Sequence, residues 1–146
     1  DTPNTSRDKT TYLSPAVKRS LIAGGLLCLT SVIIGAFAAH GLKTILSPYQ
    51  LDIVQTGAKY QMYHGLAILI CALVMLHICQ SNLLANANMA FLIGCILFCG
   101  SLYILALTQI TFVAFITPIG GLSFLLGWAL FLWAIVCSPC ESTRDC

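Results

Sequence analysis

No charged side chain occurs between Lys59 and Glu141, and this interval is the strongest constraint on how the chain can fold. A helix that crosses the hydrocarbon core of a bilayer needs roughly 20 apolar residues. The interval accommodates three such helices with short turns, whereas a fourth would leave no room for the turns. A second charge-free interval, between Arg19 and Lys43, accommodates one more helix. We therefore expect four transmembrane helices.

Composition excludes a soluble domain. Hydrophobic residues make up 58% of the chain and charged residues 8%, with a mean hydropathy of +0.90, whereas soluble domains are about 25% charged. The net charge of +2 is too small to indicate a nucleic-acid partner. The expected partners are membrane lipids and the subunits of other membrane proteins, with no nucleic acid.

The predicted fold is an all-α integral membrane four-helix bundle. Residues 1–17 are polar and are expected to be a mobile segment, and residues 138–146 form a short tail that contains cysteines. The membrane domain covers residues 18–137 between them. Its four predicted helices cover residues 18–39, 60–79, 86–107 and 117–136.

Two Pro-containing dipeptides indicate where helices begin. Ser47-Pro48 predicts the start of an amphipathic helix that extends to Lys59, lies on the membrane surface and leads into the second transmembrane helix. Thr117-Pro118 has the form of an N-cap followed by proline at the first helical position, which favours a start there for the last helix. The alternative is a longer helix from Phe112 that kinks at Pro118.

The positions of Lys and Arg predict the orientation. By chain order, five cations are expected on one side of the membrane: Arg7, Lys9, Lys18, Arg19 and Arg144. The opposite side receives only Lys43 and Lys59. Both termini are therefore expected on the cytoplasmic side of a bacterial inner membrane, or on the matrix side of a mitochondrial one.

Polar residues are expected to gather at the end of the bundle opposite the termini. The apolar run of residues 65–79 spans only about 22 Å of a core that is about 30 Å thick, so the second helix draws the polar residues before it into the membrane. Chain order brings polar residues of the other helices to the same level. The predicted polar cluster comprises His40, Thr56, Tyr60, Gln61, Tyr63, His64, Ser101, Tyr103 and Thr117.

This polar cluster allows three interpretations. It can be a hydrogen-bonded network that ties the helices together. His40 and His64 can instead be a pair of ligands for a metal or haem iron, or His64 and Tyr103 can bind a quinone or another small ligand. The sequence has no paired carboxylates, no nucleophile elbow and no metal cluster, so an enzyme that uses His64 as a base is the weakest hypothesis. We expect no catalytic residue, no bound metal and no cofactor.

Small residues recur at helical spacing and predict close helix packing. The glycines selected on this basis are Gly35, Gly94, Gly100, Gly120, Gly121 and Gly127. Packing inside the bundle is the favoured interpretation, and a homodimer interface is the alternative. A CxxC motif, Cys137 to Cys140, lies at the end of the chain with only six residues after it. We expect no redox or metal role for it, and palmitoylation of a cysteine next to the membrane is the alternative.

Four blocks of residues resemble one family. They are residues 35–42 (GAFAAHGL), residues 55–67 with Gln55-Thr56-Gly57 and His64, residues 98–103 (FCGSLY), and Thr117-Pro118-Ile119-Gly120-Gly121 with Gly127-Trp128. Their order and spacing are similar to those of the domain of unknown function 423 family, whose animal relatives are called transmembrane protein 256. The resemblance implies a four-helix protein of the bacterial or mitochondrial inner membrane, and it supplies no activity.

The expected function is that of a non-enzymatic accessory or structural subunit of a membrane assembly, because short helices with small loops offer many packing faces and little catalytic surface. The alternative is a ligand-binding or transport module for a quinone, lipid or haem at the polar cluster around His40 and His64.

Overall fold

The computed structural model describes residues 13–79 and 81–139, and every regular element in this part of the chain is helical. The first helix, α1, covers Pro15–Ala39. Ser14 caps it by accepting a hydrogen bond from the amide of Val17 at 3.3 Å, and Pro15 occupies a position whose N–H would have no partner. The helix therefore begins inside the segment predicted to be mobile, of which residues 1–12 lie outside the described residues.

The second helix, α2, covers Pro48–Val74 without a break, after a short 3₁₀ turn, η1, at Leu42–Thr44. Ser47 and Gln50 form a capping box at its start, as the Ser47-Pro48 dipeptide predicted. The prediction of a separate amphipathic surface helix before residue 60 was wrong. Nothing in residues 57–60 breaks a helix, so the amphipathic residues form the first turns of α2.

Three helical segments follow one another without a loop and form the third rod of the bundle, where a rod is one continuous helical stretch. They are α3 at Ser81–Gly94, a π-helical turn, η2, at Cys95–Cys99, and α4 at Gly100–Thr108. The rod ends where Gln109 adopts a left-handed conformation with φ of 58°. The helix was expected over residues 86–107, so the prediction located its end and missed its first turn and the π turn.

The last rod begins with a 3₁₀ turn, η3, at Thr111–Phe115 and continues as α5 at Ile116–Val136. The favoured prediction of a start near Thr117 agrees with α5 to within one residue, but Thr117 is not the N-cap. The 3₁₀ turn already directs the chain into the helix at Ile116, so Thr117 lies within the first turn. Pro118 is tolerated there because the first N–H groups of a helix have no intrahelical acceptor.

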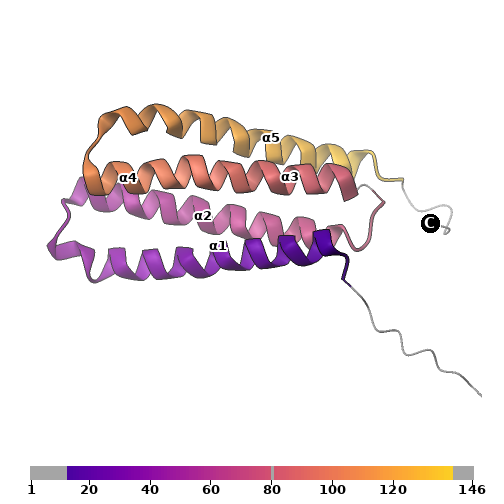
Figure 1. The fold of residues 1–146 in the computed structure, drawn as a ribbon, viewed down its shortest axis with the longest axis horizontal. Helices are drawn as coiled ribbons and strands as arrows, with labels where there is room; N and C mark the ends of the chain where they lie inside the picture. The colour runs from indigo at the N-terminus through magenta and orange to yellow at the C-terminus, as the bar shows by residue number, and fades with distance from the viewer. Residues whose placement is uncertain (1–12, 80, 140–146) are drawn as a thin grey trace, which may run out of the picture.

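The rods lie side by side and antiparallel, in the order α1, α2, α3 with α4, and α5 (Figure 1). The main contacts join α1 to α2 and α3 to α5, while α2 also packs along the whole α3–α4 rod. The two ends of the described chain lie at the same end of the bundle (Figure 1). The larger core cluster includes Ile68, Leu84, Phe91 and Phe124.

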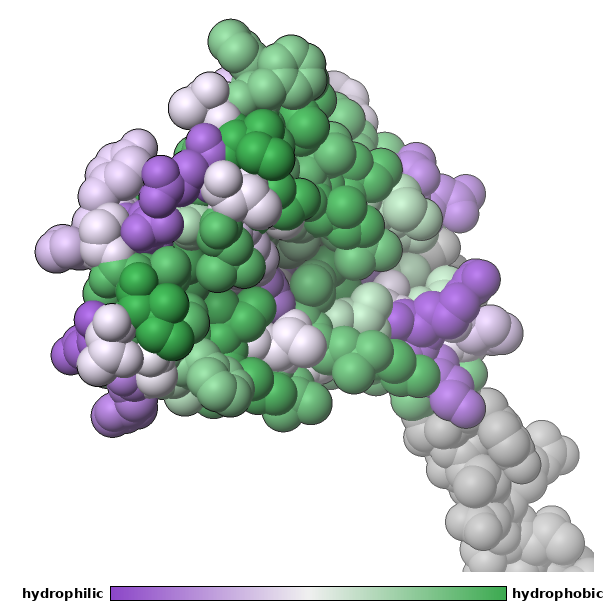
Figure 2. Space-filling model, turned by 60° about the vertical axis from the view of Figure 1, so that its left-hand side comes forward, coloured by the Kyte–Doolittle hydropathy of each residue, from purple (hydrophilic) through white to green (hydrophobic). Residues whose placement is uncertain are grey.

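The outer surface is apolar over most of its area, and hydrophilic residues gather toward the two ends (Figure 2). Three helical stretches are long and apolar enough to cross a membrane: Pro15–Ala39, Asn82–Thr108 and Thr111–Val136. Exposed leucine, isoleucine and phenylalanine side chains cover α1 and α5 in particular. Such a surface is unstable in water and is expected for a protein surrounded by lipid.

Candidate functional site

Gln61 lies at the centre of a hydrogen-bonded network inside the bundle. Its side chain is buried on α2. The amide nitrogen donates to the carbonyl oxygen of Leu27 at 3.0 Å and to the hydroxyl oxygen of Thr30 at 2.6 Å, both on α1. The amide oxygen accepts a hydrogen bond of 2.8 Å from the hydroxyl of Tyr103 on α4. One glutamine therefore connects three rods and uses both of its N–H groups.

Gly57 and Ala58, two consecutive residues of α2, complete this part of the network. A Cβ at Gly57 would lie 2.6 Å from the ring of Tyr103, so only glycine lets the tyrosine reach Gln61. On the α1 side, Ser31 donates a 2.7 Å hydrogen bond to the carbonyl oxygen of Ala58. The polar groups of this part of the bundle are thus satisfied by one another, as buried groups in a membrane require.

His64 also lies on α2, one turn deeper than Tyr60, and is buried. Its Nε2 accepts a 3.2 Å hydrogen bond from the indole N–H of Trp128 on α5. Its Nδ1 lies 2.8 Å from the carbonyl oxygen of Tyr60. Because an indole nitrogen can only donate and a carbonyl oxygen can only accept, His64 is neutral with its proton on Nδ1.

Aromatic side chains cover the face of the His64 ring, in addition to the hydrogen bonds at its two nitrogens. It stacks on Phe124 with ring centroids 3.5 Å apart and an interplanar angle of 8°. Phe91 lies 5.5 Å away on the α3 side. With both nitrogens hydrogen-bonded and the face covered, the imidazole has no free lone pair to offer to a metal.

A third polar contact joins α4 to α5. The hydroxyls of Ser101 and Thr117 lie 2.6 Å apart, and Ser101 donates to the carbonyl oxygen of Phe98 at 2.8 Å. Since a hydroxyl has one proton, Thr117 is the donor to Ser101. The residue predicted as a helix cap is instead a contact between helices.

The predicted polar cluster therefore divides into separate contacts rather than one site. Gln61 with Tyr103, and Ser101 with Thr117, are direct hydrogen-bonded pairs. The ring of Tyr60 stacks on that of His64 and meets that of Tyr63 edge-on, with centroids 6.1 Å apart in each case. Thr56, half-buried on α2, and His40, exposed at the end of α1, do not join these contacts.

The proposed ligand pair of His40 and His64 is not formed. Ala38 and Val54 belong to one small core cluster and so mark one level of the bundle. His64 lies ten residues further along α2 than Val54, roughly 15 Å deeper by the rise of a helix, and His40 lies on the other side of that level. Within the described residues, no group of three or more His, Cys, Asp or Glu is placed to hold a metal.

Sequence reasoning missed two partners of the predicted polar residues and one separate polar contact. Thr30 lies in the middle of α1 and Trp128 in α5, and each completes the hydrogen bonding of a predicted residue. Asn88, buried on α3, donates a 2.9 Å hydrogen bond to the hydroxyl of Ser20. The available signal for Asn88 was an amide in the middle of an otherwise apolar helix.

The predicted packing glycines separate into two groups. A Cβ at Gly94, Gly120 or Gly127 would lie 2.4–2.6 Å from a phenylalanine, so these glycines are required for packing within the bundle. Gly35 and Gly100 have nothing within 4 Å, and Gly121 has only the ring of Phe98 at 3.9 Å. The close glycines that the sequence analysis did not select are Gly24, Gly57 and Gly65, all at contacts of α2.

The fold and these contacts define an all-helical membrane protein in which the buried polar groups of the described residues hydrogen-bond within the bundle, with the exception of Oδ1 of Asn88. Residues 34–121 match the model of the family described as protein of unknown function (DUF423). The chain belongs to this family, as the resemblance had indicated.

Relatives support the same assignment. A UPF0382 membrane protein of Staphylococcus haemolyticus is 41% identical over 119 residues, covering 80% of this chain and 93% of the relative. The UPF0382 membrane protein YwdK of Bacillus subtilis is 36% identical over 82% of this chain and 98% of its own. The UPF0382 inner membrane protein YgdD of Escherichia coli is 44% identical over 69% of this chain and 76% of its own. No solved structure matches.

Proposed function

We propose that the chain is a non-enzymatic, four-pass protein of a bacterial or mitochondrial inner membrane and serves as an accessory or structural subunit of a larger membrane assembly. The observation that carries the proposal is a set of glycines that face outward from the bundle.

The connection of the rods supports a crossing by α2. This helix is not one of the three stretches selected by length and composition. However, α1 ends at one end of the bundle and α3 begins at the other, so α2 has to cover the same distance between them (Figure 1). Its two charged residues, Asp52 and Lys59, are exposed and lie in its first half, from which a long lysine side chain reaches the interface.

The charges favour cytoplasmic or matrix termini. Lys18 and Arg19 lie at the end of the bundle where the described chain begins, and Lys43 lies at the opposite end. Arg7, Lys9 and Arg144, which the sequence analysis assigned to the same side, lie outside the described residues. The positive-inside rule therefore places both termini on the cytoplasmic or matrix side.

The closed interior supports a role without catalysis. His64 has both nitrogens engaged, and Gln61 has both N–H groups and its oxygen engaged. A general base or a nucleophile needs a free group in a space that a substrate can enter. These residues instead stabilise the arrangement of the rods.

Two outward glycines on α1 indicate a partner helix. A glycine within a helix costs about 1 kcal/mol relative to alanine, and Gly24 offsets this cost by admitting the backbone of Gly65. Gly25 and Gly35 have no atom within 4 Å of a Cβ position. A helix of another protein that approaches this surface closely would account for them, because glycine permits close contact between helix backbones in membranes.

These two glycines share one flank of α1. By the 100° step of an α-helix, Gly25 and Gly35 fall on the opposite side of the α2 contact from Ser20 and Ala23, which face α3. The proposed partner surface therefore borders the α2 contact on the side away from α3, with Gly35 closer to that contact than Gly25.

Purification in a gentle detergent followed by native mass measurement tests the proposal. The wild-type chain is expected in a species heavier than its own 15.7 kDa. The double variant Gly25→Leu with Gly35→Leu is expected to release the free chain. Ala129→Leu, an equally bulky change at an exposed small residue of α5, is the matched control and should leave the assembly intact.

A wild-type chain that runs alone under these conditions would refute the proposed subunit role. So would a loss of assembly in the Ala129→Leu control that equals the loss in the glycine variant. A complex that contains only copies of this chain would replace an accessory role with self-association.

A further inference from the structure

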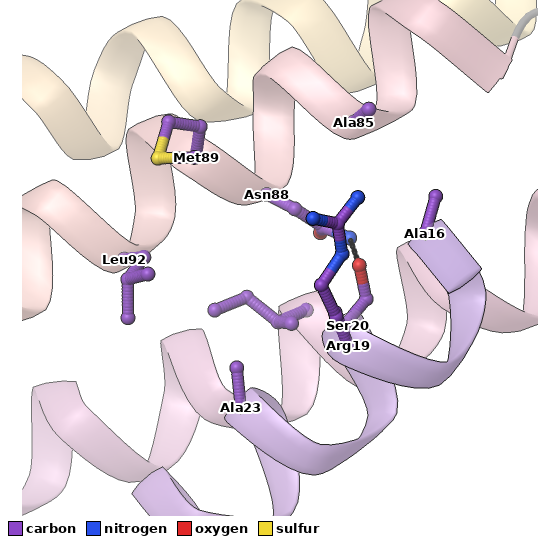
Figure 3. A pocket seen from close by; sticks show the side chains of 9 residues that line it. Ala16, Arg19, Ser20, Ala23, Ala85, Asn88, Met89 and Leu92 are labelled. Atoms are coloured by element: carbon purple, nitrogen blue, oxygen red, sulfur yellow. Dashed lines mark hydrogen bonds between the residues drawn. The ribbon is translucent and has the colours of Figure 1, made fainter.

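A pocket of about 310 Å³ lies between α1 and α3 at the end of the bundle that holds the termini (Figure 3). Its polar lining comes from Arg19 and Ser20 of α1 and from Asn88 of α3. Ala23, Ile68 and Leu92 continue it as an apolar wall toward the middle of the bundle. Because α1 and α3 touch only slightly, the pocket opens sideways, toward the lipid.

Asn88 has an unused hydrogen-bond acceptor at this pocket. The residue is only 7% exposed, and its Nδ2 donates to Ser20 at 2.9 Å. Its Oδ1 is buried and has no hydrogen-bond partner. In Figure 3 the amide and the guanidinium of Arg19 point toward the same space between the helices. A buried acceptor without a donor is costly, so a donor that enters the pocket would be bound favourably.

Arg19 supplies a positive charge beside this acceptor. Asp52 is the only acidic residue in the described part of the chain, and it lies near the opposite end of the bundle. Arg19 therefore has no carboxylate partner among the described residues. Arginine at the level of lipid headgroups is well suited to binding a phosphodiester, because its planar guanidinium donates several hydrogen bonds to phosphate oxygens.

The pocket lies at the depth in the bundle where lipid headgroups are expected. Arg19 follows the start of α1 by four residues, or roughly 6 Å along the axis. The volume lies near the lower limit of small-molecule pockets, which begins at about 300 Å³. It therefore fits a headgroup, while acyl chains would follow the apolar wall formed by Ala23, Ile68 and Leu92.

We propose that this pocket binds the headgroup of an anionic glycerophospholipid of the phosphatidylglycerol type. Arg19 pairs with the phosphodiester, and a hydroxyl of the glycerol end group donates to Oδ1 of Asn88. A choline end group has no donor for Asn88. An ethanolamine end group has a donor, but its positive charge opposes Arg19. The site lies on the other flank of α1 from Gly25 and Gly35, so it does not depend on the proposed function.

Native mass spectrometry of the full chain in a mild detergent tests the site by titration with defined lipids. Phosphatidylglycerol is compared with phosphatidylmethanol, which has the same charge and lacks the end-group hydroxyls, and with phosphatidylcholine. The wild-type chain is expected to bind phosphatidylglycerol about fivefold more tightly than phosphatidylmethanol, and to bind both more tightly than phosphatidylcholine.

Two variants separate the contributions. Arg19→Gln should weaken phosphatidylglycerol about tenfold and remove the preference over phosphatidylcholine. Asn88→Leu should leave binding of phosphatidylmethanol unchanged and remove the preference for phosphatidylglycerol over it. The matched controls are Lys18→Gln, the neighbouring cation, and Asn86→Leu, an exposed amide on the same helix; neither residue lines the pocket, and neither change should alter the order of the lipids.

Three results would overturn the proposal. The first is a wild-type chain that binds phosphatidylglycerol and phosphatidylmethanol equally, a comparison that needs no variant to fold. The second is an effect of Lys18→Gln as large as that of Arg19→Gln, which would show attraction to the surface charge alone. The third is an Asn88→Leu variant that keeps the hydroxyl preference, which would mean that a group other than Asn88 recognises the hydroxyl.

Discussion

The hydroxyl of Tyr103 donates a 2.8 Å hydrogen bond to the side-chain oxygen of Gln61, across two rods of the bundle. The same glutamine donates to Leu27 and Thr30 of α1. A glutamine in an apolar interior is costly unless all of its groups find partners. Here the cost is offset by three contacts that hold α1, α2 and α4 at one rotation relative to each other.

Removal of the tyrosine hydroxyl should destabilise the bundle. Tyr103→Phe leaves the oxygen of Gln61 without its donor, and the expected cost is about 1–2 kcal/mol of unfolding free energy. Unfolding in mixed micelles with increasing denaturing detergent measures this difference. Tyr63→Phe, at a half-exposed ring of α2, is the control and should change stability by less than about 0.5 kcal/mol.

Two adjacent glycines of α5 should respond oppositely to alanine. A Cβ at Gly120 would lie 2.4 Å from the backbone nitrogen of Phe98, so Gly120→Ala forces α5 away from η2 and should cost about 1–3 kcal/mol. At Gly121 the nearest atom lies 3.9 Å away. Gly121→Ala should therefore be neutral or stabilising by up to about 1 kcal/mol. Thermal unfolding of both variants in one detergent makes the comparison, and an equal loss in both would contradict the packing described at Phe98.

The protonation state of His64 can be observed directly. In nitrogen-15 spectra of labelled histidine, the ring of His64 should have a protonated Nδ1 and an unprotonated Nε2. The Nδ1 of His77 also lies near a carbonyl oxygen, that of Leu73 at 3.1 Å, so a substitution at Trp128 is needed to assign the ring of His64. Trp128→Phe should shift the Nε2 resonance of this ring and leave those of His40 and His77 in place, because the indole donates only to His64. A bis-histidine haem spectrum after addition of ferric haem would contradict the assignment, since both nitrogens are engaged.

The orientation of the chain gives a prediction for reporter fusions. Green fluorescent protein fused after the last residue should be fluorescent in a bacterial host, and alkaline phosphatase at the same place should be inactive. Alkaline phosphatase inserted in the turn between α4 and η3, near Gln109, should be active, because this turn lies at the opposite end of the bundle. Activity at the C-terminus would reverse the orientation proposed from Lys and Arg.

The predictable part of the fold came from long-range patterns of charge and from local caps. The charge-free intervals indicated the apolar rods, and Ser47-Pro48 indicated the true start of α2. Thr117-Pro118 has the same form and is not a cap, because the preceding residues already form the 3₁₀ turn η3. A Ser-Pro or Thr-Pro dipeptide is compatible with a helix start, but the conformation of the preceding residues determines where the helix begins.

The sequence predicted which residues belong to the candidate site, but it did not predict which of them contact each other. Tyr103 and Gln61 were both selected because they are polar residues in apolar helices. Their contact depends on how α2 is rotated relative to α4, and Gly57 permits that rotation. The spacing of residues within a single helix cannot predict how two helices are rotated relative to each other. The separation of His40 from His64 likewise followed from α2 being longer than expected, which moved His64 deeper into the bundle.

The five-residue π turn at Cys95–Cys99 has a consequence for how the gene can change. A π turn holds one residue more than an α-helical turn would, and each residue in a helix advances the side chains by about 100°. The π turn absorbs this extra residue within about one turn, so a deletion of one codon in this segment would let the rod close into a regular α-helix and would leave Ser101 and Tyr103 facing their partners. The same deletion elsewhere inside a rod would rotate all later side chains by about 100°. Single-residue deletions should therefore be tolerated better in this segment than elsewhere within the rods.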